Sequence, residues 1–289
     1  MVKIDVSIII VNWKVRDLLQ KCLDSILIYK NNYNLEIFVV DNNSQDTSVE
    51  MIRSDYPQVK LLALPKNIGF GAANNLAIKQ AQADYIFLLN PDTEITADFF
   101  VRIFEYMDNN PVVGIAGPKI KNDDASQQPS IRREPDLLSQ ILIMLKLKNV
   151  LVDNKLLNKY LFKDFDYNKI QTVDQIMGAA MFMRRSVFDK IGLFDEKFFI
   201  WFEEVDLCRR AKQAKIVIKY FPEALIIHHG AKSFSKSGIL RKQIIFNKSL
   251  LYYFSKHKSF WQTLIILCLI PINIILTLAY VIFRKSKGK

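Results

Sequence analysis

The chain has 289 residues, half of them apolar, and a formal net charge of +11. This length allows one large domain or two small ones, and the apolar content excludes a largely disordered chain. The charge is uneven, because residues 209–289 hold 16 lysines and arginines against the single acid Glu223, whereas residues 1–208 are close to neutral.

The first part of the chain alternates strand-like and helix-like segments. Apolar or β-branched runs predict strands at residues 6–13, 35–41, 59–65 and 85–92. Apolar spacing predicts helices at residues 16–29, 46–57 and 75–83. Alternating units of this length predict a parallel sheet covered by helices on both faces, with ligands bound beyond the carboxyl ends of the strands.

Polar residues follow each of the four strands. They are Asn12 after the first, Asp41, Asn42 and Asn43 after the second, Asn67 to Gly71 after the third, and Asn90, Asp92 and Glu94 after the fourth. Each group alone suits a turn or a helix cap. Four such groups at one edge of a sheet predict a ligand cleft.

The second part is less regular. A polar loop at residues 121–135 precedes an apolar-rich segment at 137–162, which predicts a helical pair against a substrate site or a membrane. Residues 173–195 predict a strand and a short helix, and another helix begins near Glu203. Residues 217–230 predict two short strands ending in His228 and His229.

Residues 260–283 form an apolar run of 24 residues without a charge. Basic residues bracket the run: Lys256, Lys258, Arg284, Lys285, Lys287 and Lys289. The run is long enough to span a bilayer, although Pro271 and Asn273 at its centre also suit a re-entrant or in-plane helix. A buried core helix and a nucleic-acid-binding surface are both disfavoured, because the run lacks a polar face and the charges only flank it. We expect a body at residues 1–250 and a membrane segment at 251–289.

The cysteines indicate the compartment. Cys22, Cys208 and Cys268 are odd in number and far apart, which favours a reducing compartment over a zinc site or a disulfide framework. The chain enters its first predicted strand without an apolar leader. We expect the body at the cytoplasmic face of a membrane, attached peripherally or by a single span.

The stretch NIGFGAANN, residues 67–75, places Gly69 and Gly71 before a predicted helix. It resembles a dinucleotide fingerprint, but Asn74 replaces the third glycine and the stretch follows the third strand instead of the first. The hypothesis that the protein is a nicotinamide-dependent oxidoreductase rests on this stretch alone. The glycines equally suit a close approach of backbone N–H groups to phosphate or sugar.

The stretch LLNPDTE, residues 88–94, places Asp92 just beyond an apolar strand. Mg²⁺ and Mn²⁺ bind carboxylate oxygen, keep several waters and bridge to substrate phosphates. A single aspartate with a distant histidine is a small ligand set typical of such a site. An ordinary turn is the alternative interpretation.

The stretch FIWFEEVDLCRR, residues 199–210, gathers the carboxylates of Glu203, Glu204 and Asp206 within four positions. In the first turn of a helix they would meet unsatisfied N–H groups and the positive end of the helix dipole. That structural role is the more common one for such a segment taken alone. The polar residues that follow the predicted strands elsewhere in the chain favour a chemical role for these three carboxylates.

Seven stretches in order resemble the family 2 glycosyltransferases, and within them the rhamnosyltransferase-like enzymes of bacterial surface polysaccharide assembly. They are VSIIIVNW, VVDNNSQDTS, NIGFGAANN, LLNPDTE, GAAMFMRRSVFDKIGLFDE, FFIWFEEVDLCRR and HHG, over roughly residues 5–240. The resemblance implies an α/β GT-A fold, a Rossmann-like mixed sheet flanked by helices. It also implies inverting transfer of a sugar, with rhamnose the first choice, from dTDP-rhamnose or a UDP-sugar to a hydroxyl of a growing glycan. A polyprenyl-diphosphate-linked acceptor would share the membrane with the apolar segment.

The resemblance also implies roles for single residues. The donor pocket would contain Val11, Asn12, Asp41, Asn43, Asn67, Gly69, Asn74 and Asn90. Asp92 and His228 would bind Mg²⁺ or Mn²⁺, and Asn90 stands where the family has an acid, which removes one charged ligand.

The same resemblance makes Glu204 the general base, in place of the family's usual aspartate, and leaves Glu203 and Asp206 to orient the acceptor or the helix. Crowded acids should raise the pKa of Glu204, while the helix start and the arginines oppose that shift. The rival hypothesis is a non-catalytic, membrane-attached nucleotide-sugar-binding protein with a degenerate site. Its only support is that Asn90 and Glu204 both differ from the residues usual in the family.

Overall fold

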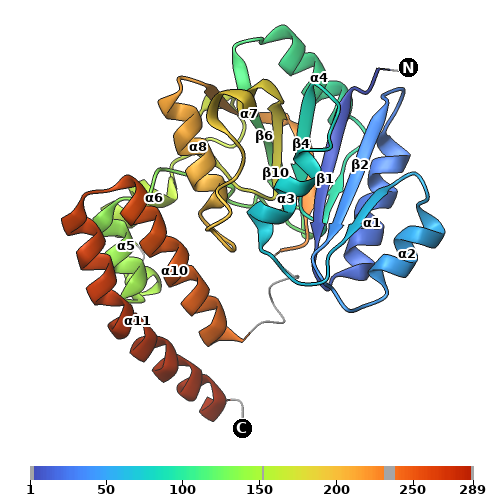
Figure 1. The fold of residues 1–289 in the computed structure, drawn as a ribbon. Helices are drawn as coiled ribbons and strands as arrows, with labels where there is room; N and C mark the ends of the chain where they lie inside the picture. The colour runs from blue at the N-terminus through green and yellow to red at the C-terminus, as the bar shows by residue number, and fades with distance from the viewer. Residues whose placement is uncertain (1–2, 152, 231–237, 288–289) are drawn as a thin grey trace.

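The structure, a computed structural model, describes residues 3–151, 153–230 and 238–287 (Figure 1). Its main sheet has the strand order β3-β2-β1-β4-β10-β6-β11-β5, with β8 pairing β11 at the side. The strands are β1 Val6–Asn12, β2 Leu35–Asp41, β3 Lys60–Ala63, β4 Tyr85–Leu89, β5 Thr93–Ile95, β6 Val113–Lys121, β8 Gln171–Thr172, β10 Ala180–Arg184 and β11 Val217–His228. A separate small sheet pairs β7 Ile131–Arg132 with β9 Gln175–Ile176.

Two apolar layers fix the position of the sheet. Helices α1 Arg16–Tyr29, α2 Ser48–Asp55 and α4 Phe99–Asn109 pack on one face. Helices α3 Phe70–Ile78, α7 Ser186–Ile191 and α8 Glu203–Gln213 pack on the other. Because β1 is buried on both faces, it reads as a continuous apolar run instead of an alternating one. The central strands therefore sit between two cores, as the alternation of elements predicts.

The sheet is mixed, and the four strands predicted in the first part of the chain are parallel as expected. Strands β3, β2, β1 and β4 are parallel, but β10 lies antiparallel between β4 and β6. Strand β10 follows a long excursion through the small sheet, and this long-range path has no signal in local spacing. The mixed sheet agrees with the fold that the family resemblance implies.

Two elements differ from their predicted bounds. Helix α3 begins at Phe70, five residues before the predicted start, because the glycine stretch itself becomes the first turn. Residues 217–228 form one strand, β11, instead of two, and a register irregularity between Phe221 and Leu225 absorbs the break at Pro222. The predicted strand and short helix of residues 173–195 appear as β10 and α7.

A group of helices lies to one side of the sheet (Figure 1). We call it the helical platform and define it as α5 Leu137–Met144, α6 Lys155–Leu161, α10 Ile239–His257 and α11 Phe260–Lys287. The pair α5 and α6 confirms the helical pair expected at residues 137–162, and the 3₁₀ turn η1 Leu147–Asn149 joins its members. A third apolar cluster, including Phe202, Leu250 and Phe254, packs the platform against the segment before α8.

Helix α11 buries the polar residues at its centre and leaves much of its apolar surface exposed. Asn273 is buried, donates to the Met144 carbonyl at 2.6 Å and accepts from the Asn247 amide at 2.9 Å. The opposite face leaves large apolar side chains exposed, including Trp261, Ile265, Ile272, Ile275 and Ile282. This arrangement is the reverse of a helix on a water-soluble surface.

Within the described residues, Phe260–Phe283 of α11 is the one helical stretch long and apolar enough to cross a membrane, a criterion of length and composition that is weak support for a span. The expected boundary between residues 250 and 251 falls inside α10, which runs unbroken from Ile239 to His257. The division into two parts stays a prediction.

We predict that Asn273→Leu destabilises the protein, because it leaves the Met144 carbonyl and the Asn247 amide buried without their partner. The free energy of unfolding should fall by about 1–3 kcal/mol. Ile275→Leu on the exposed face is the matched control and should change it by less than about 0.5 kcal/mol. Chemical unfolding in detergent measures both, and equal stability of the two variants would contradict the inward role of Asn273.

Candidate active site

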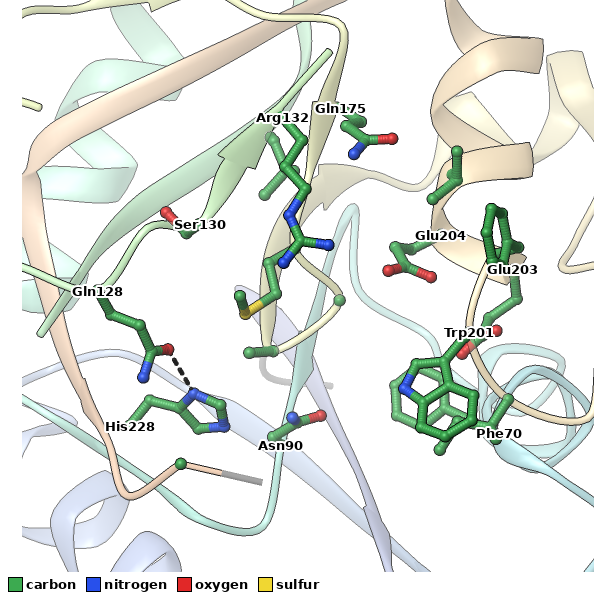
Figure 2. A pocket seen from close by; sticks show the side chains of 18 of the residues that line it. Phe70, Asn90, Gln128, Ser130, Arg132, Gln175, Trp201, Glu203, Glu204 and His228 are labelled. Carbon is green, nitrogen blue, oxygen red and sulfur yellow. Dashed lines mark hydrogen bonds between the residues drawn. The ribbon is translucent and has the colours of Figure 1, made fainter. Parts of the chain in front are cut away.

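A cavity of about 520 Å³ lies beside the carboxyl end of β4. It is bounded by the end of β4, the polar loop, the turn between β9 and β10, the start of α8, and α10. Polar side chains that line it are Asn90, Gln128, Ser130, Arg132, Gln175, Glu203, Glu204 and His228 (Figure 2). Asp92 also belongs to the lining. The cavity therefore brings the acidic segment together with the strand end that carries Asp92.

The acidic segment enters its helix through an unusual backbone. Trp201 and Phe202 have φ values of +66° and +69°, in the left-handed region that bulky residues rarely adopt. Phe202 packs in the platform cluster, and its carbonyl accepts from the Asp206 N–H at 2.8 Å, which starts α8. Such strain persists only where the surroundings fix it, and it is common at functional sites.

The two adjacent glutamates differ in their surroundings. Glu203 is 3% exposed, and its Oε2 has no hydrogen-bond partner among the described residues. Burial, together with the nearby charge of Glu204, raises the pKa of Glu203 well above its usual value. The carboxylate of Glu204 points into the cavity (Figure 2). Burial also raises the pKa of Glu204, and the positive charge of Arg132 opposes that rise. Burial, more than crowding among the acids, is thus the main cause of the raised pKa of Glu204.

Asp92 and His228 meet at the other side of the cavity. Asp92 lies beyond β4 and His228 ends β11, and the Asp92 Oδ1 is 3.2 Å from the His228 Nε2. The His228 Nδ1 is 2.7 Å from the Gln128 Oε1 (Figure 2). Because a carbonyl oxygen only accepts, Nδ1 donates to Gln128, and this contact turns Nε2 toward Asp92. That Nε2 is buried and has no hydrogen-bond partner in the described part of the chain.

A second polar cluster lies at the ends of β1 and β2. The register pairs Asn12 with Asp41, and the Asn12 amide donates to Asp41 Oδ1 at 2.9 Å and to Ser44 Oγ at 3.0 Å. The Ser44 N–H also donates to Asp41 Oδ2 at 3.0 Å. Asn12 and Asp41 are nearly fully buried, so their side chains are held rigidly.

The glycine turn is fastened to this cluster. The Asn42 side chain accepts from the Ile68 N–H and donates to the Gly69 carbonyl, and Asn67 accepts from the Gly69 N–H at 3.0 Å. Gly69 has a φ of +94°, and a Cβ there would lie 2.4 Å from the Phe199 carbonyl oxygen. Only glycine therefore lets this turn touch the segment that leads to Glu204.

The remaining predicted site residues lie outside the cavity lining. Val11 packs in the core, Asn43 sits in a left-handed turn, and the buried Asn74 amide donates to the Phe70 carbonyl in its own helix. Asp206 lies in the first turn of α8, is fully buried, and its carboxylate contacts Arg210, Lys256 and His257. The expected set thus divides into the cavity group, the strand-end cluster of Asn12 and Asp41 with the glycine turn, and Asp206 on the buried face of α8.

Sequence reasoning missed the cavity residues from the polar loop. Gln128 orients His228, and Arg132 points into the cavity near Glu204 (Figure 2). The loop returns to the site because β7 pairs with β9, and Tyr167 receives the N–H groups of Ser130 and Ile131. The only sequence signal was an arginine pair inside an otherwise polar loop, which alone indicates a solvated surface.

The fold and the site agree with a known enzyme family. The description Glycosyl transferase family 2 matches residues 7–192, more than half of the chain. The chain therefore belongs to glycosyltransferase family 2 and is a glycosyltransferase. Within the family it is rhamnosyltransferase-like, as its relatives indicate.

One relative is the N-acetylglucosaminyl-diphospho-decaprenol L-rhamnosyltransferase of Mycobacterium tuberculosis, 26% identical over 79% of this chain and 77% of that protein. A second is the rhamnosyltransferase WbbL of Escherichia coli, 24% identical over 84% of this chain and 96% of that protein. Among solved structures, GalNAc-T7 with UDP, GalNAc and Mn²⁺ is similar in fold, with a TM-score of 0.60 and 13% identity, over 88% of this chain and 50% of that one. The GT-A-like fold that the sequence implies is confirmed.

We predict that Glu203→Gln raises stability at neutral pH. The folded state holds the pKa of Glu203 above its ordinary value of 4.5, so the folded protein binds the proton more tightly than the unfolded chain. The stability this provides is full below pH 4.5 and is lost as the pH rises through the folded pKa. A permanently neutral glutamine removes that loss.

The free energy of unfolding of wild type and Glu203→Gln should therefore diverge as the pH rises from about 4.5 to 8, with the variant the more stable. Glu223→Gln, an exposed position on β11, is the control and should show no such divergence. A Glu203→Gln variant that is less stable than wild type at pH 8 would mean that the carboxylate is ionised and paired.

Proposed function

We propose that this protein transfers rhamnose from a nucleotide diphosphate to a hydroxyl of a lipid-linked glycan with inversion at the anomeric carbon. One observation carries the proposal: the carboxylate of Glu204 faces the same cavity as Asn90, Asp92 and His228. A base and a candidate diphosphate site in one cavity are what an in-line displacement requires. The names of the rhamnosyltransferase relatives support the sugar and the lipid-linked acceptor.

Glu204 acts as the general base. The acceptor hydroxyl oxygen attacks the anomeric carbon from the face opposite the diphosphate, and the bond from that carbon to the diphosphate oxygen breaks, with its electron pair leaving on the diphosphate. Glu204 takes the hydroxyl proton in the same step. Its raised pKa makes it a stronger base than an ordinary glutamate, while Arg132 keeps it from being protonated too readily. Attack from the opposite face inverts the configuration.

Asp92 and His228 fit one divalent cation. They offer a carboxylate and a buried imidazole Nε2 without a hydrogen-bond partner, oriented by Gln128. No group of three or more His, Cys, Asp or Glu side chains suited to a metal occurs in the described residues, so water and the donor diphosphate would complete the coordination. Bound Mg²⁺ or Mn²⁺ would neutralise charge on the departing diphosphate.

The strand-end cluster suits the nucleoside of the donor. Asn12 donates both amide hydrogens to Asp41 and Ser44, and its Oδ1 has no hydrogen-bond partner in the described part of the chain. An amide oxygen can accept from the ring N–H that thymine and uracil share, which agrees with dTDP-rhamnose or a UDP-sugar. Asn67 and Gly69 shape the turn beside this cluster, and Asp206 acts as a positioning residue beneath the catalytic turn.

We predict that Glu204→Gln lowers the rate of sugar transfer by about 10²–10⁴-fold, because glutamine cannot take the proton. Donor binding should persist, because the base does not contact the diphosphate site. Glu223→Gln serves as the matched control. The measurement is steady-state transfer from dTDP-rhamnose to a lipid-linked N-acetylglucosaminyl acceptor, with donor binding followed by calorimetry.

The pH profile provides a second test. Below the pKa of Glu204 the base is protonated, so kcat/KM should fall as the pH drops through a value above 4.5, the ordinary glutamate pKa. Unchanged transfer by Glu204→Gln would rule out the base assignment. A wild-type protein that binds donor but transfers nothing under all these conditions would favour the binding-protein alternative.

The exposed apolar face of α11 suits a membrane surface more than a span. Helix α10 lies side by side with α11, and α5 touches it near its middle (Figure 1). Helix α10 carries Arg241, Lys242 and Lys248, so a spanning α11 would draw these charges into the bilayer. An in-plane helix buries its apolar face in the leaflet and keeps the charged partner at the interface. We propose in-plane attachment at the cytoplasmic face.

We predict that Ile275→Glu weakens binding to anionic phospholipid vesicles, whereas Val112→Glu, an equally exposed apolar residue on the body, leaves it unchanged. Flotation of the purified full chain measures both variants. A green fluorescent protein fused after residue 289 should fluoresce in cells, because an in-plane helix leaves the C-terminus in the cytoplasm. Activity of an alkaline phosphatase fused at the same point would instead establish a span.

A further inference from the structure

One wall of the cavity carries a positive charge whose only role in the proposed transfer is to moderate the pKa of Glu204. Arg132, on β7, lines the cavity and points into it between Glu204 and the His228–Gln128 pair (Figure 2). It is exposed, and it forms no ion pair with any carboxylate in the part of the chain that the structure describes. The acids nearest in sequence are engaged elsewhere, since Glu134 pairs with Arg209 and Lys258.

A second cation lies on the helical platform, outside the cavity lining. Lys148 lies in η1, between α5 and α6, and is also exposed without an ion pair among the described residues. Burial of its side chain lowers the pKa of Lys148, and the nearby charge of Arg132 lowers it further. An anion bound near both cations would be stabilised by the two charges together.

The wall ends at the helical platform. Lys146, two residues before Lys148, donates to the Gln243 side chain of α10, and the Met144 carbonyl accepts from Asn273 of α11. The segment that carries Lys148 is therefore held against α10 and α11. The strand that carries Arg132 also lies against the platform, because the Arg133 N–H donates to the Tyr160 carbonyl of α6. Glu204 and Arg132 line the cavity, Lys148 stands on the platform, and α11 of the platform carries the exposed apolar face.

We propose that Arg132 and Lys148 bind the diphosphate of a lipid-linked acceptor. The three features match the three parts of such a molecule: the sugar hydroxyl would lie at Glu204, the diphosphate at the two cations, and the isoprenoid chain at the apolar face of α11. The planar guanidinium suits two phosphate oxygens at once, and the lysine adds a point charge. This inference rests on the proposed function, and it assigns the donor diphosphate to the Asp92 and His228 side.

The test uses ligands that separate the two diphosphates and do not require turnover. Farnesyl diphosphate stands for the lipid diphosphate, farnesol for the same chain without charge, and dTDP for the donor. Their binding to the full-length protein in detergent is measured by calorimetry for wild type, Arg132→Ala, Lys148→Ala and the control Arg53→Ala. Arg53 is exposed on α2, on the other face of the sheet.

We expect the Kd of farnesyl diphosphate to rise about tenfold or more in Arg132→Ala and Lys148→Ala, the size of one charge-assisted phosphate contact. Farnesol and dTDP should bind all four proteins alike, and Arg53→Ala should match wild type throughout. Unchanged melting temperatures would show that the exposed substitutions leave the fold intact.

Three results would overturn the inference. In the first, the wild type binds farnesyl diphosphate no more tightly than farnesol. In the second, all variants bind farnesyl diphosphate equally well. In the third, Arg132→Ala and Lys148→Ala bind dTDP more weakly than the wild type does. The last would assign the wall to the donor. The inference and the proposed function can also fail separately. If the two variants selectively lose farnesyl diphosphate binding but the wild type transfers no sugar, the lipid-diphosphate site is supported and the proposed function is refuted.

Discussion

A single buried carboxylate, Asp206, holds the start of α8, where Glu203 and Glu204 lie, to the helical platform. Its oxygens lie 2.6 Å from His257 Nε2, 2.7 Å from Lys256 Nζ and 2.8 Å from Arg210 Nε. Burial alone would raise the pKa of Asp206, but these three partners outweigh it and lower the pKa. Removing one partner of such a buried cluster costs about 3–5 kcal/mol. Because Lys256 and His257 end α10, the charge cluster fastens α8 to the helical platform.

That connection places the chemistry next to the proposed membrane surface. The glutamates begin α8, the platform carries the exposed apolar face of α11, and one cavity is lined by the glutamates, by Arg132 and by Phe246 of α10. The glycine turn holds the other side, since Phe70 N–H and Gly69 both contact the Phe199 carbonyl. The segment from Phe199 to Phe202 is thus fixed at both ends, which explains how two left-handed aromatic residues persist before Glu203.

Local pattern predicted a good deal of the fold and of the site. The four parallel strands at residues 6–92 and the helices between them follow from apolar spacing, and the polar residues after each strand follow from the rule that ligands bind at carboxyl ends. Seven ordered stretches were enough to indicate family 2, which the comparison confirms. These features depend on neighbours a few residues apart, so sequence alone determined them.

Tertiary structure decided the rest, because it depends on contacts between residues far apart in the chain. The antiparallel insertion of β10, the return of the polar loop that brings Arg132 to Glu204, and the Asp206 cluster with His257 all have no local signal. The rotation of α11 about its own axis is another example. The sequence of α11 is apolar on nearly every side, and only packing against Met144 and Asn247 determines that Asn273 faces inward. Sequence determined which side chains stand at the strand ends and helix start, and tertiary packing determined which of them share a cavity.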